Sequence, residues 1–97
     1  MFEIKFTPEA IEDLRWFQRA TRRKILTELE SQLSYEPAVE TRNRKRLHPN
    51  KLAEWELRVE RFRVFFDMDL ENRLIKVEAV GYKEGSRLFI QGREYPL

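Results

Sequence analysis

Apolar and polar residues alternate most regularly between residues 54 and 80, and this pattern predicts three short strands joined by two tight turns. Successive side chains of a strand point to opposite faces of its sheet, so each strand has one apolar and one polar face. Phe65 falls among the polar positions. The residues expected on the apolar face are Trp55, Leu57, Val59, Phe62, Val64, Phe66, Met68, Ile75, Val77 and Ala79.

A single strand register places all these apolar residues together, because a slip of one residue reverses the two faces. In this register Arg58 lies opposite Arg63, Arg63 lies beside Glu78, and Phe66 lies opposite Ile75. Like charges directly opposite each other destabilise a sheet. The arginine pair therefore suggests an anion-binding site, and the alternative is that both side chains extend separately into solvent.

The residues before this sheet predict a strand followed by a helical hairpin. Residues 1–6 alternate as an edge strand does, and residues 7–35 carry apolar side chains at helical spacing. Thr7 suits the N-cap and Pro8 the first helical position. The second helix is expected to begin near residues 20–21 and to end before Pro37.

The remaining segments complete a single domain over residues 1–97. Residues 36–53 lack periodicity and are expected to form a basic loop, before the three-stranded meander of residues 54–80. Residues 81–97 form a C-terminal segment in which residues 87–90 are either a short helical turn or a strand. This order predicts an α+β fold with the helical hairpin packed on one face of a small antiparallel sheet and the other face open.

Composition excludes several classes of site. The 97-residue chain has no cysteine and one histidine, which excludes disulfides, thiolate metal sites and histidine-rich metal sites, and we expect no cofactor. It contains no apolar run long enough to cross a membrane. Its first residues lack the pattern of a signal peptide, so we expect a cytoplasmic protein.

Basic residues concentrate in one stretch although the net charge is only +2. A local basic patch on a nearly neutral protein suits phosphate contacts, and it equally suits an acidic protein partner. Trp16 and Trp55 are expected to pack between helices and sheet, whereas Tyr82 is expected to be exposed and able to stack on a base. The candidate residues for contacts with nucleic acid are Arg42, Arg44, Lys45, Arg46, Lys51 and Tyr82.

The polar face of the sheet offers groups for RNA cleavage without a metal. In that reaction a base removes the 2′-hydroxyl proton, cations stabilise the phosphorane and an acid protonates the leaving oxygen. Arginine suits the second role because its fork binds phosphate in a bidentate manner. Glu56 shares a face with Arg58 and is either the base or a salt-bridge partner of the arginines, and His48 is either a general acid or an incidental loop residue.

Four stretches together resemble the RelE/ParE superfamily of toxins from type II toxin-antitoxin systems. They are T-P-E-A at the first helix, K-R-L-H-P-N-K-L in the loop, W-E-L-R-V with F-R-V-F-F-D in the strands, and V-G-Y-K-E-G-S-R-L-F-I near the end. The resemblance implies a RelE-like fold similar to that of microbial ribonucleases, and an antitoxin that wraps and neutralises the toxin. It also implies messenger RNA cleavage in the ribosomal A site for the RelE branch, or inhibition of DNA gyrase for the ParE branch.

The resemblance also implies a catalytic set. Arg58 and Arg63 match family cations, whereas a family lysine two residues before the first is Glu56 here. The family arginine after the last strand falls on Lys83. The late tyrosine of the family's ribonucleases falls on Phe89, which has no hydroxyl and cannot transfer a proton. The implied catalytic residues are thus Arg58, Arg63, Lys83 and Glu56.

Three functional hypotheses follow from the resemblance. The first, which we favour, is a RelE-like toxin that binds the ribosome through its basic loop and cleaves messenger RNA, with Tyr82 or Tyr95 replacing the missing hydroxyl only if either lies near Arg63. The second is a ParE-like inhibitor of gyrase without nuclease activity. The third is a degenerate toxin retained as an antitoxin-binding, autoregulatory module. All three imply a cognate antitoxin and a toxin-antitoxin hetero-oligomer, without a membrane partner.

Overall fold

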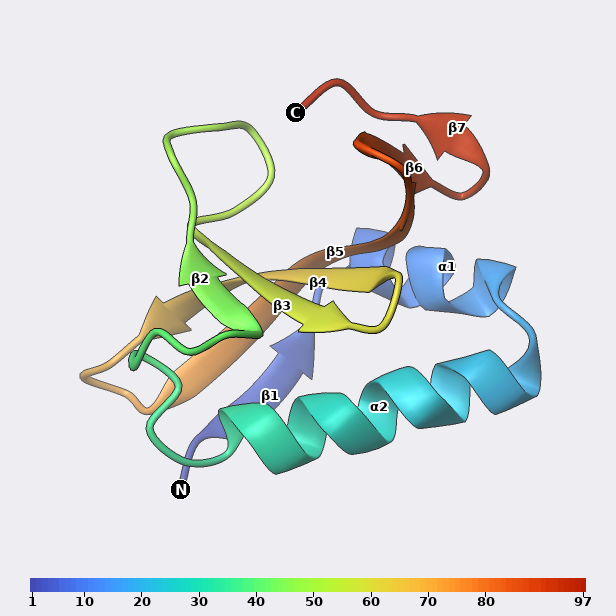
Figure 1. Cartoon of the computed structure of the whole chain (residues 1–97). Coiled ribbons are helices and arrows are strands. Elements are labelled where there is room, and N and C mark those ends of the chain that lie inside the picture. The colour runs from blue at the N-terminus through green and yellow to red at the C-terminus, as the bar shows by residue number, and fades with distance from the viewer.

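The computed structural model describes residues 1–97, with two helices on one side of a seven-stranded sheet (Figure 1). The helices are α1 (Pro8–Trp16) and α2 (Arg19–Leu33), and neither is long and apolar enough to span a bilayer. The strands are β1 (Glu3–Phe6), β2 (Arg44–Arg46), β3 (Trp55–Val59), β4 (Phe62–Asp69), β5 (Leu74–Glu84), β6 (Arg87–Ile90) and β7 (Arg93–Glu94). Their order is β2-β3-β4-β5-β6-β7, and β1 pairs in parallel with β5. The predicted helical hairpin on one face of a largely antiparallel sheet is confirmed.

Local hydrogen bonds define the helical hairpin. The Thr7 hydroxyl accepts a hydrogen bond from the Ala10 amide at 3.1 Å and caps α1 as expected. The second helix begins at Arg19, slightly before the predicted start, and has neither a side-chain cap nor an acid in its first turn. Arg22 instead donates to the carbonyl of Phe17 at 3.0 Å, so this cation supports the carbonyl end of α1.

The apolar face of the sheet packs on both helices and forms the main core. This cluster contains 16 buried residues. They are Ala10, Leu14, Phe17, Ile25, Leu29, Leu33, Trp55, Leu57, Val59, Phe62, Val64, Phe66, Ile75, Val77, Val80 and Tyr82. The apolar faces of β3 and β4 therefore lie where alternation placed them.

The β3–β4 hairpin has the predicted register, whereas β4–β5 does not. Arg58 pairs with Arg63 across the first turn. Phe66 pairs with Val77 rather than Ile75, and Phe65 pairs with Ala79, so Glu78 is an extra residue in β5. The predictions that Phe66 lies opposite Ile75 and that Arg63 lies beside Glu78 are both wrong. The turn before β5 lies one residue later than expected, with Asp69 opposite Leu74, and beyond Phe66 the β-bulge shifts the register further.

The bulge also reverses which residues of β5 face the helices. Val77 lies in the main core, and beyond the bulge Val80 takes that position while Ala79 lies on the other face. Ala79, expected in the main core, is therefore placed wrongly by simple alternation. An extra residue changes the parity of every later side chain in the strand.

The outer face, away from the helices, is partly covered rather than open. Figure 1 shows the loop after β2 and the β6–β7 hairpin on the side of the sheet opposite α2. Phe65, Ala79, Leu88 and Ala53 form a second buried cluster there. The segments expected as a basic loop and a C-terminal segment thus contain β2, β6 and β7, and residues 87–90 form a strand.

Candidate anion-binding site on the outer face

Two arginines share the outer face at the β3–β4 turn. Arg58 and Arg63 are Cα partners in neighbouring strands, and their sequence neighbours Leu57 and Val64 point into the core. Alternation therefore directs both arginines away from the helices. The side chain of Arg58 is 48% exposed and that of Arg63 is 12% exposed. Arg58 is thus the arginine that an incoming anion reaches first.

Glu56 lies between the two guanidinium groups. Its side chain is 5% exposed, with one oxygen 3.7 Å from Arg58 Nε and the other 4.0 Å from Arg63 Nε. The structure places it in the salt bridge considered from sequence, although this bridge is buried on the glutamate side. One carboxylate between two guanidinium groups leaves one net positive charge and explains how the arginine pair is tolerated.

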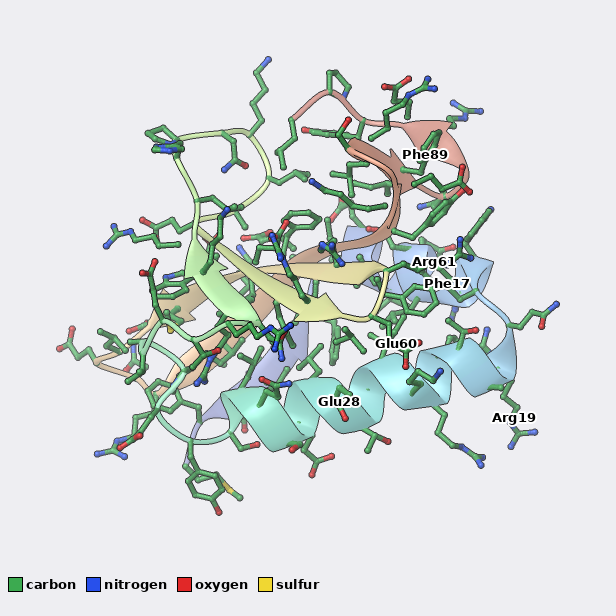
Figure 2. The ribbon with its side chains drawn as sticks, viewed as in Figure 1. Phe17, Arg19, Glu28, Glu60, Arg61 and Phe89 are labelled. Atoms are coloured by element: carbon green, nitrogen blue, oxygen red, sulfur yellow. The ribbon has the colours of Figure 1, made fainter.

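Arg63 is also a structural residue of the β3–β4 turn. Its Nη1 donates to the carbonyls of Glu60 at 2.8 Å and Phe62 at 2.9 Å, and Glu60 has a positive φ of 56°. Burial and the nearby Arg58 lower the pKa of Arg63, against the opposing effect of Glu56. Glu60 in turn contacts Lys24 of α2 at 3.2 Å, and Figure 2 shows the side chain of Glu60 extending toward α2. The β3–β4 turn is therefore held by Arg63 on the outer face and by the ion pair of Glu60 with Lys24 on the helix side.

Lys83 lies on the same face as the arginines. Gly81 pairs with Arg63 across β4–β5, and Lys83 follows Gly81 by two residues, hence on the same face. Gly81 allows the chain to turn back over the sheet here, because a Cβ at this position would collide with the carbonyl oxygen of Phe89. Arg58, Arg63, Lys83 and Glu56 are thus brought to one end of the outer face.

The basic stretch divides into exposed and buried members. Arg42, Lys45 and Lys51 are exposed, and Arg46 is exposed with its guanidinium 3.6 Å from Glu54. The expected exposure of Arg44 is wrong. Its Nη1 donates to the carbonyl of Gln32 in the last turn of α2 at 2.7 Å and to that of Glu36 in the following loop at 3.1 Å. The last turn of a helix leaves carbonyls without intrahelical donors, and Arg44 supplies a donor to the Gln32 carbonyl.

Replacing Arg44 is therefore expected to destabilise the fold. Arg44→Ala leaves the part-buried Gln32 carbonyl at the end of α2 without this donor and should lower the free energy of unfolding by about 2 kcal/mol. Urea denaturation measures this change. The exposed neighbour Lys45→Ala is the control and should change stability by less than about 0.5 kcal/mol. Equal effects of the two substitutions would contradict the capping role.

The expected exposure of Tyr82 is also wrong. Tyr82 is 9% exposed and stacks between Trp16 and Phe89, with ring centroids 5.5 Å and 5.4 Å away. Arg61 lies over its ring at 5.1 Å. Figure 2 shows Arg61, Phe17 and Phe89 at this end of the molecule. Both Tyr82 and Phe89 therefore face the helix side, away from the arginines.

Trp55 is buried in the main core as expected. Trp16 does pack on the sheet through Tyr82, but it stays 47% exposed. Tyr95 lies on the outer side, where it packs against the second cluster and its amide donates to the Leu88 carbonyl at 2.8 Å. Tyr95 is thus the tyrosine that shares a face with Arg63.

His48 and an acidic pair occupy the opposite end of the outer face. His48 is exposed in the loop and lines a cleft of about 640 Å³ together with Asp67 and Glu78. Burial and the neighbouring Asp67 carboxyl raise the pKa of Glu78, against the attraction of Lys76 at 3.5 Å. Alternation alone did not place Asp67 and Glu78 beside each other, because Glu78 is the extra residue of the β-bulge and lies outside the regular strand pairing.

The raised pKa of Glu78 leads us to expect that the stability of the fold depends on pH. The folded-state pKa of Glu78 is above the usual value of 4.5, so the folded protein favours the protonated carboxyl. The free energy of unfolding therefore decreases as pH rises through the raised pKa and Glu78 ionises. Glu78→Gln is therefore expected to be more stable than wild type at pH 7 and not at pH 4. Denaturation at both values tests this, with Glu71→Gln as an exposed control. A Glu78→Gln gain at pH 4 equal to that at pH 7 would contradict it.

Comparison with known proteins adds to this geometry. A family model described as the ParE toxin of the type II toxin-antitoxin system parDE matches residues 4–86. The chain belongs to this family. It is the toxin of a type II toxin-antitoxin system, of the RelE/ParE superfamily, as the resemblance implied. A search of curated proteins finds no match.

Solved structures of related toxins share the fold. The RelBE2 toxin-antitoxin complex of Mycobacterium tuberculosis is 21% identical, with a TM-score of 0.73 over 84% of this chain and 91% of that one. The isolated Escherichia coli RelE toxin is 17% identical, with a TM-score of 0.68 over 87% and 86%. The Staphylococcus aureus YoeB dimer is 23% identical, with a TM-score of 0.63 over 86% and 98%. The RelE-like fold expected for the toxin is confirmed.

Proposed function

We propose that the toxin inhibits translation by cleaving messenger RNA on the ribosome. The observation that supports this most directly is the Arg58–Arg63 pair on the outer face, with Lys83 on the same face of the adjoining strand. Three cations at one end of a face bind a phosphodiester and stabilise the extra charge of a phosphorane. The other end carries Asp67 and Glu78, which repel a phosphate backbone and confine it to the arginines.

Each member of the site has a role in this proposal. The half-exposed Arg58 contacts the scissile phosphate, and Arg63 holds it from below with the guanidinium group that also fixes the turn. A phosphate competes with Glu56 for both arginines, and the released carboxylate then takes the 2′-hydroxyl proton. The Lys83 ammonium donates a proton to the leaving 5′-oxygen, which becomes the 5′-hydroxyl of the downstream fragment.

The exposed cations of the basic stretch are proposed to contact the ribosome. Arg42, Lys45, Arg46 and Lys51 are exposed and suit ribosomal RNA phosphates, and Lys45 pairs with Glu56 on the outer face. Because the ribosome is the proposed target, the proposed location is the cytoplasm.

A cognate antitoxin is the second proposed partner. The similar M. tuberculosis structure is a toxin-antitoxin complex, as is the intact E. coli RelBE structure. We therefore propose that this toxin forms a hetero-oligomer with an antitoxin, which keeps it inactive.

Inhibition of DNA gyrase without RNA cleavage is a second candidate function. It is favoured by Phe89, which offers no hydroxyl and packs on Tyr82 at the helix side rather than on the outer face. It is also favoured by the ParE description of the matching family. In this case no bond is broken and the arginine pair is not required for inhibition.

Parallel assays separate the candidates. The purified toxin is added to an in vitro translation reaction with mapping of messenger ends, and to a gyrase supercoiling reaction. New messenger ends with lost translation support cleavage, whereas lost supercoiling with intact messenger supports gyrase inhibition. If neither reaction changes at saturating toxin, both proposals fail and an antitoxin-binding, autoregulatory module remains.

A further inference from the structure

The β-bulge of β5 is held by Thr7, the N-cap of α1, and by Asp13 within that helix. The Val80 amide donates to Asp13 Oδ2 at 3.0 Å instead of to a strand. The Thr7 amide donates to the Val77 carbonyl at 3.0 Å, and the Thr7 hydroxyl donates to the Glu78 carbonyl at 3.3 Å. A bulge interrupts the strand ladder and leaves backbone groups that need other partners. Helix α1 supplies these partners.

Asp13 also ties the bulge to the C-terminal hairpin. The residue is 4% exposed, and its Oδ1 accepts a hydrogen bond from Gln91 Nε2 at 2.7 Å. Gln91 lies between β6 and β7 with a positive φ of 52°. No lysine or arginine lies within ion-pair distance of the Asp13 carboxylate, so two neutral donors satisfy it. The buried Asp13 carboxylate therefore links the Val80 amide in the bulge to the Gln91 side chain in the C-terminal hairpin.

The bulge determines which face of the sheet Lys83 occupies. Beyond Glu78 the parity of β5 is reversed, so Val80 and Tyr82 enter the core while Gly81 and Lys83 face outward with Arg63. Without the extra residue Lys83 would point toward the helices and Tyr82 toward the RNA. The correct parity is therefore a condition for three cations on one face.

We propose that Asp13 is a positioning residue that holds Lys83 beside the arginine pair by capping the bulge. The proposal rests on the proposed function of the outer face. Asp13 itself does not contact the RNA, and its effect on cleavage passes through the orientation of Lys83 and the β6–β7 hairpin.

Two substitutions at Asp13 separate capping from charge. Asp13→Ala removes both acceptors and frees the Val80 amide. Asp13→Asn keeps one acceptor for Val80, and its amide can donate to the Gln91 oxygen once that side chain flips. Ser34→Ala is the matched control, because this equally buried hydroxyl donates to the Glu30 carbonyl at 2.6 Å, away from β5.

The first measurement concerns structure alone. Hydrogen exchange of the Val80 amide should accelerate at least about tenfold in Asp13→Ala, and remain near wild type in Asp13→Asn and Ser34→Ala. The chain has no cysteine, so spin labels at Lys45→Cys and Lys83→Cys report the distance between two outer-face positions. That distance should broaden or lengthen only in Asp13→Ala.

The second measurement is a double-mutant cycle in messenger cleavage. Lys83→Ala should lower cleavage about tenfold in wild type and in Ser34→Ala. It should lower it less than about threefold in Asp13→Ala, because the lysine is already displaced there. A merely structural loss would leave the effect of Lys83→Ala unchanged.

The outcomes distinguish this proposal from the proposed function. Unchanged Val80 exchange and label distance in Asp13→Ala would overturn the positioning role, as would a tenfold Lys83 effect in that background. If Asp13→Asn also lost the slow exchange of the Val80 amide and the wild-type label distance, the charge of Asp13 rather than its capping would matter. This result would also overturn the positioning role. If wild type cleaves no messenger, the proposed function fails while exchange and label distance still test the capping of the bulge.

Discussion

Replacing Arg58 by alanine is expected to lower messenger cleavage about a hundredfold, the size of effect seen when one preorganised donor to a transition-state oxygen is lost. Arg58 is half exposed, and its side chain donates no hydrogen bond within the protein. Its one ionic contact is with Glu56 at 3.7 Å. The substitution therefore removes a phosphate ligand and should change the free energy of unfolding by less than about 0.5 kcal/mol.

Arg58 is a better test of the site than Arg63. Removing Arg63 would also remove the hydrogen bonds to Glu60 and Phe62 that fix the turn. Arg19→Ala is the matched control, because Arg19 is exposed on α2, has no ion pair and carries the same charge. Kinetics of messenger cleavage and urea denaturation are measured for both variants.

Comparison of Arg58→Ala with Arg19→Ala separates a specific phosphate site from an effect of total charge. Equal losses in Arg58→Ala and Arg19→Ala would mean that total charge, rather than the pair, drives binding. Wild-type cleavage in Arg58→Ala would exclude the pair as the phosphate site. Gyrase inhibition that persists in Arg58→Ala, with no cleavage by wild type, would favour the second candidate function.

The β3–β4 hairpin could be predicted because its information is local. Its two-residue turn joins strands that alternate without interruption, so Arg58 and Arg63 follow as partners. The second hairpin could not be predicted in the same way. Its turn lies one residue later than alternation places it, and its bulge is held by Asp13 and Thr7, which are more than sixty residues away in the chain. A bulge held by distant side chains leaves no periodic signal within the strand itself.

The burial of charged and aromatic side chains also could not be predicted from the sequence. Arg44 belongs to a run of basic residues that looks uniformly solvated, yet it is buried and donates to the Gln32 carbonyl in the last turn of α2. Tyr82 follows a glycine near a turn and looks exposed, but the reversed parity of β5 buries it. Glu56 was correctly placed beside Arg58, and only the structure shows how little of it reaches solvent.

Phe65→Ala is expected to lower the free energy of unfolding by about 3–5 kcal/mol, because it removes a fully buried aromatic ring. Alternation places Phe65 on an open polar face, where the same change would cost less than about 0.5 kcal/mol. The structure instead packs the ring against Ala53, Ala79 and Leu88, beneath the C-terminal hairpin. Urea denaturation therefore decides between an open outer face and a second core.

The controls for Phe65→Ala test where the lost stability resides. Leu70→Ala removes a side chain that is 59% exposed in the β4–β5 turn and should be nearly neutral. Hydrogen exchange should show the Phe65→Ala loss first in the β5–β6 pairing, since Leu88 packs on the ring while the main core stays intact. Because that pairing carries Lys83, messenger cleavage should fall in Phe65→Ala even at temperatures where the helices remain folded. A stable variant with protected β6 amides would show that the outer cluster does not hold the hairpin in place.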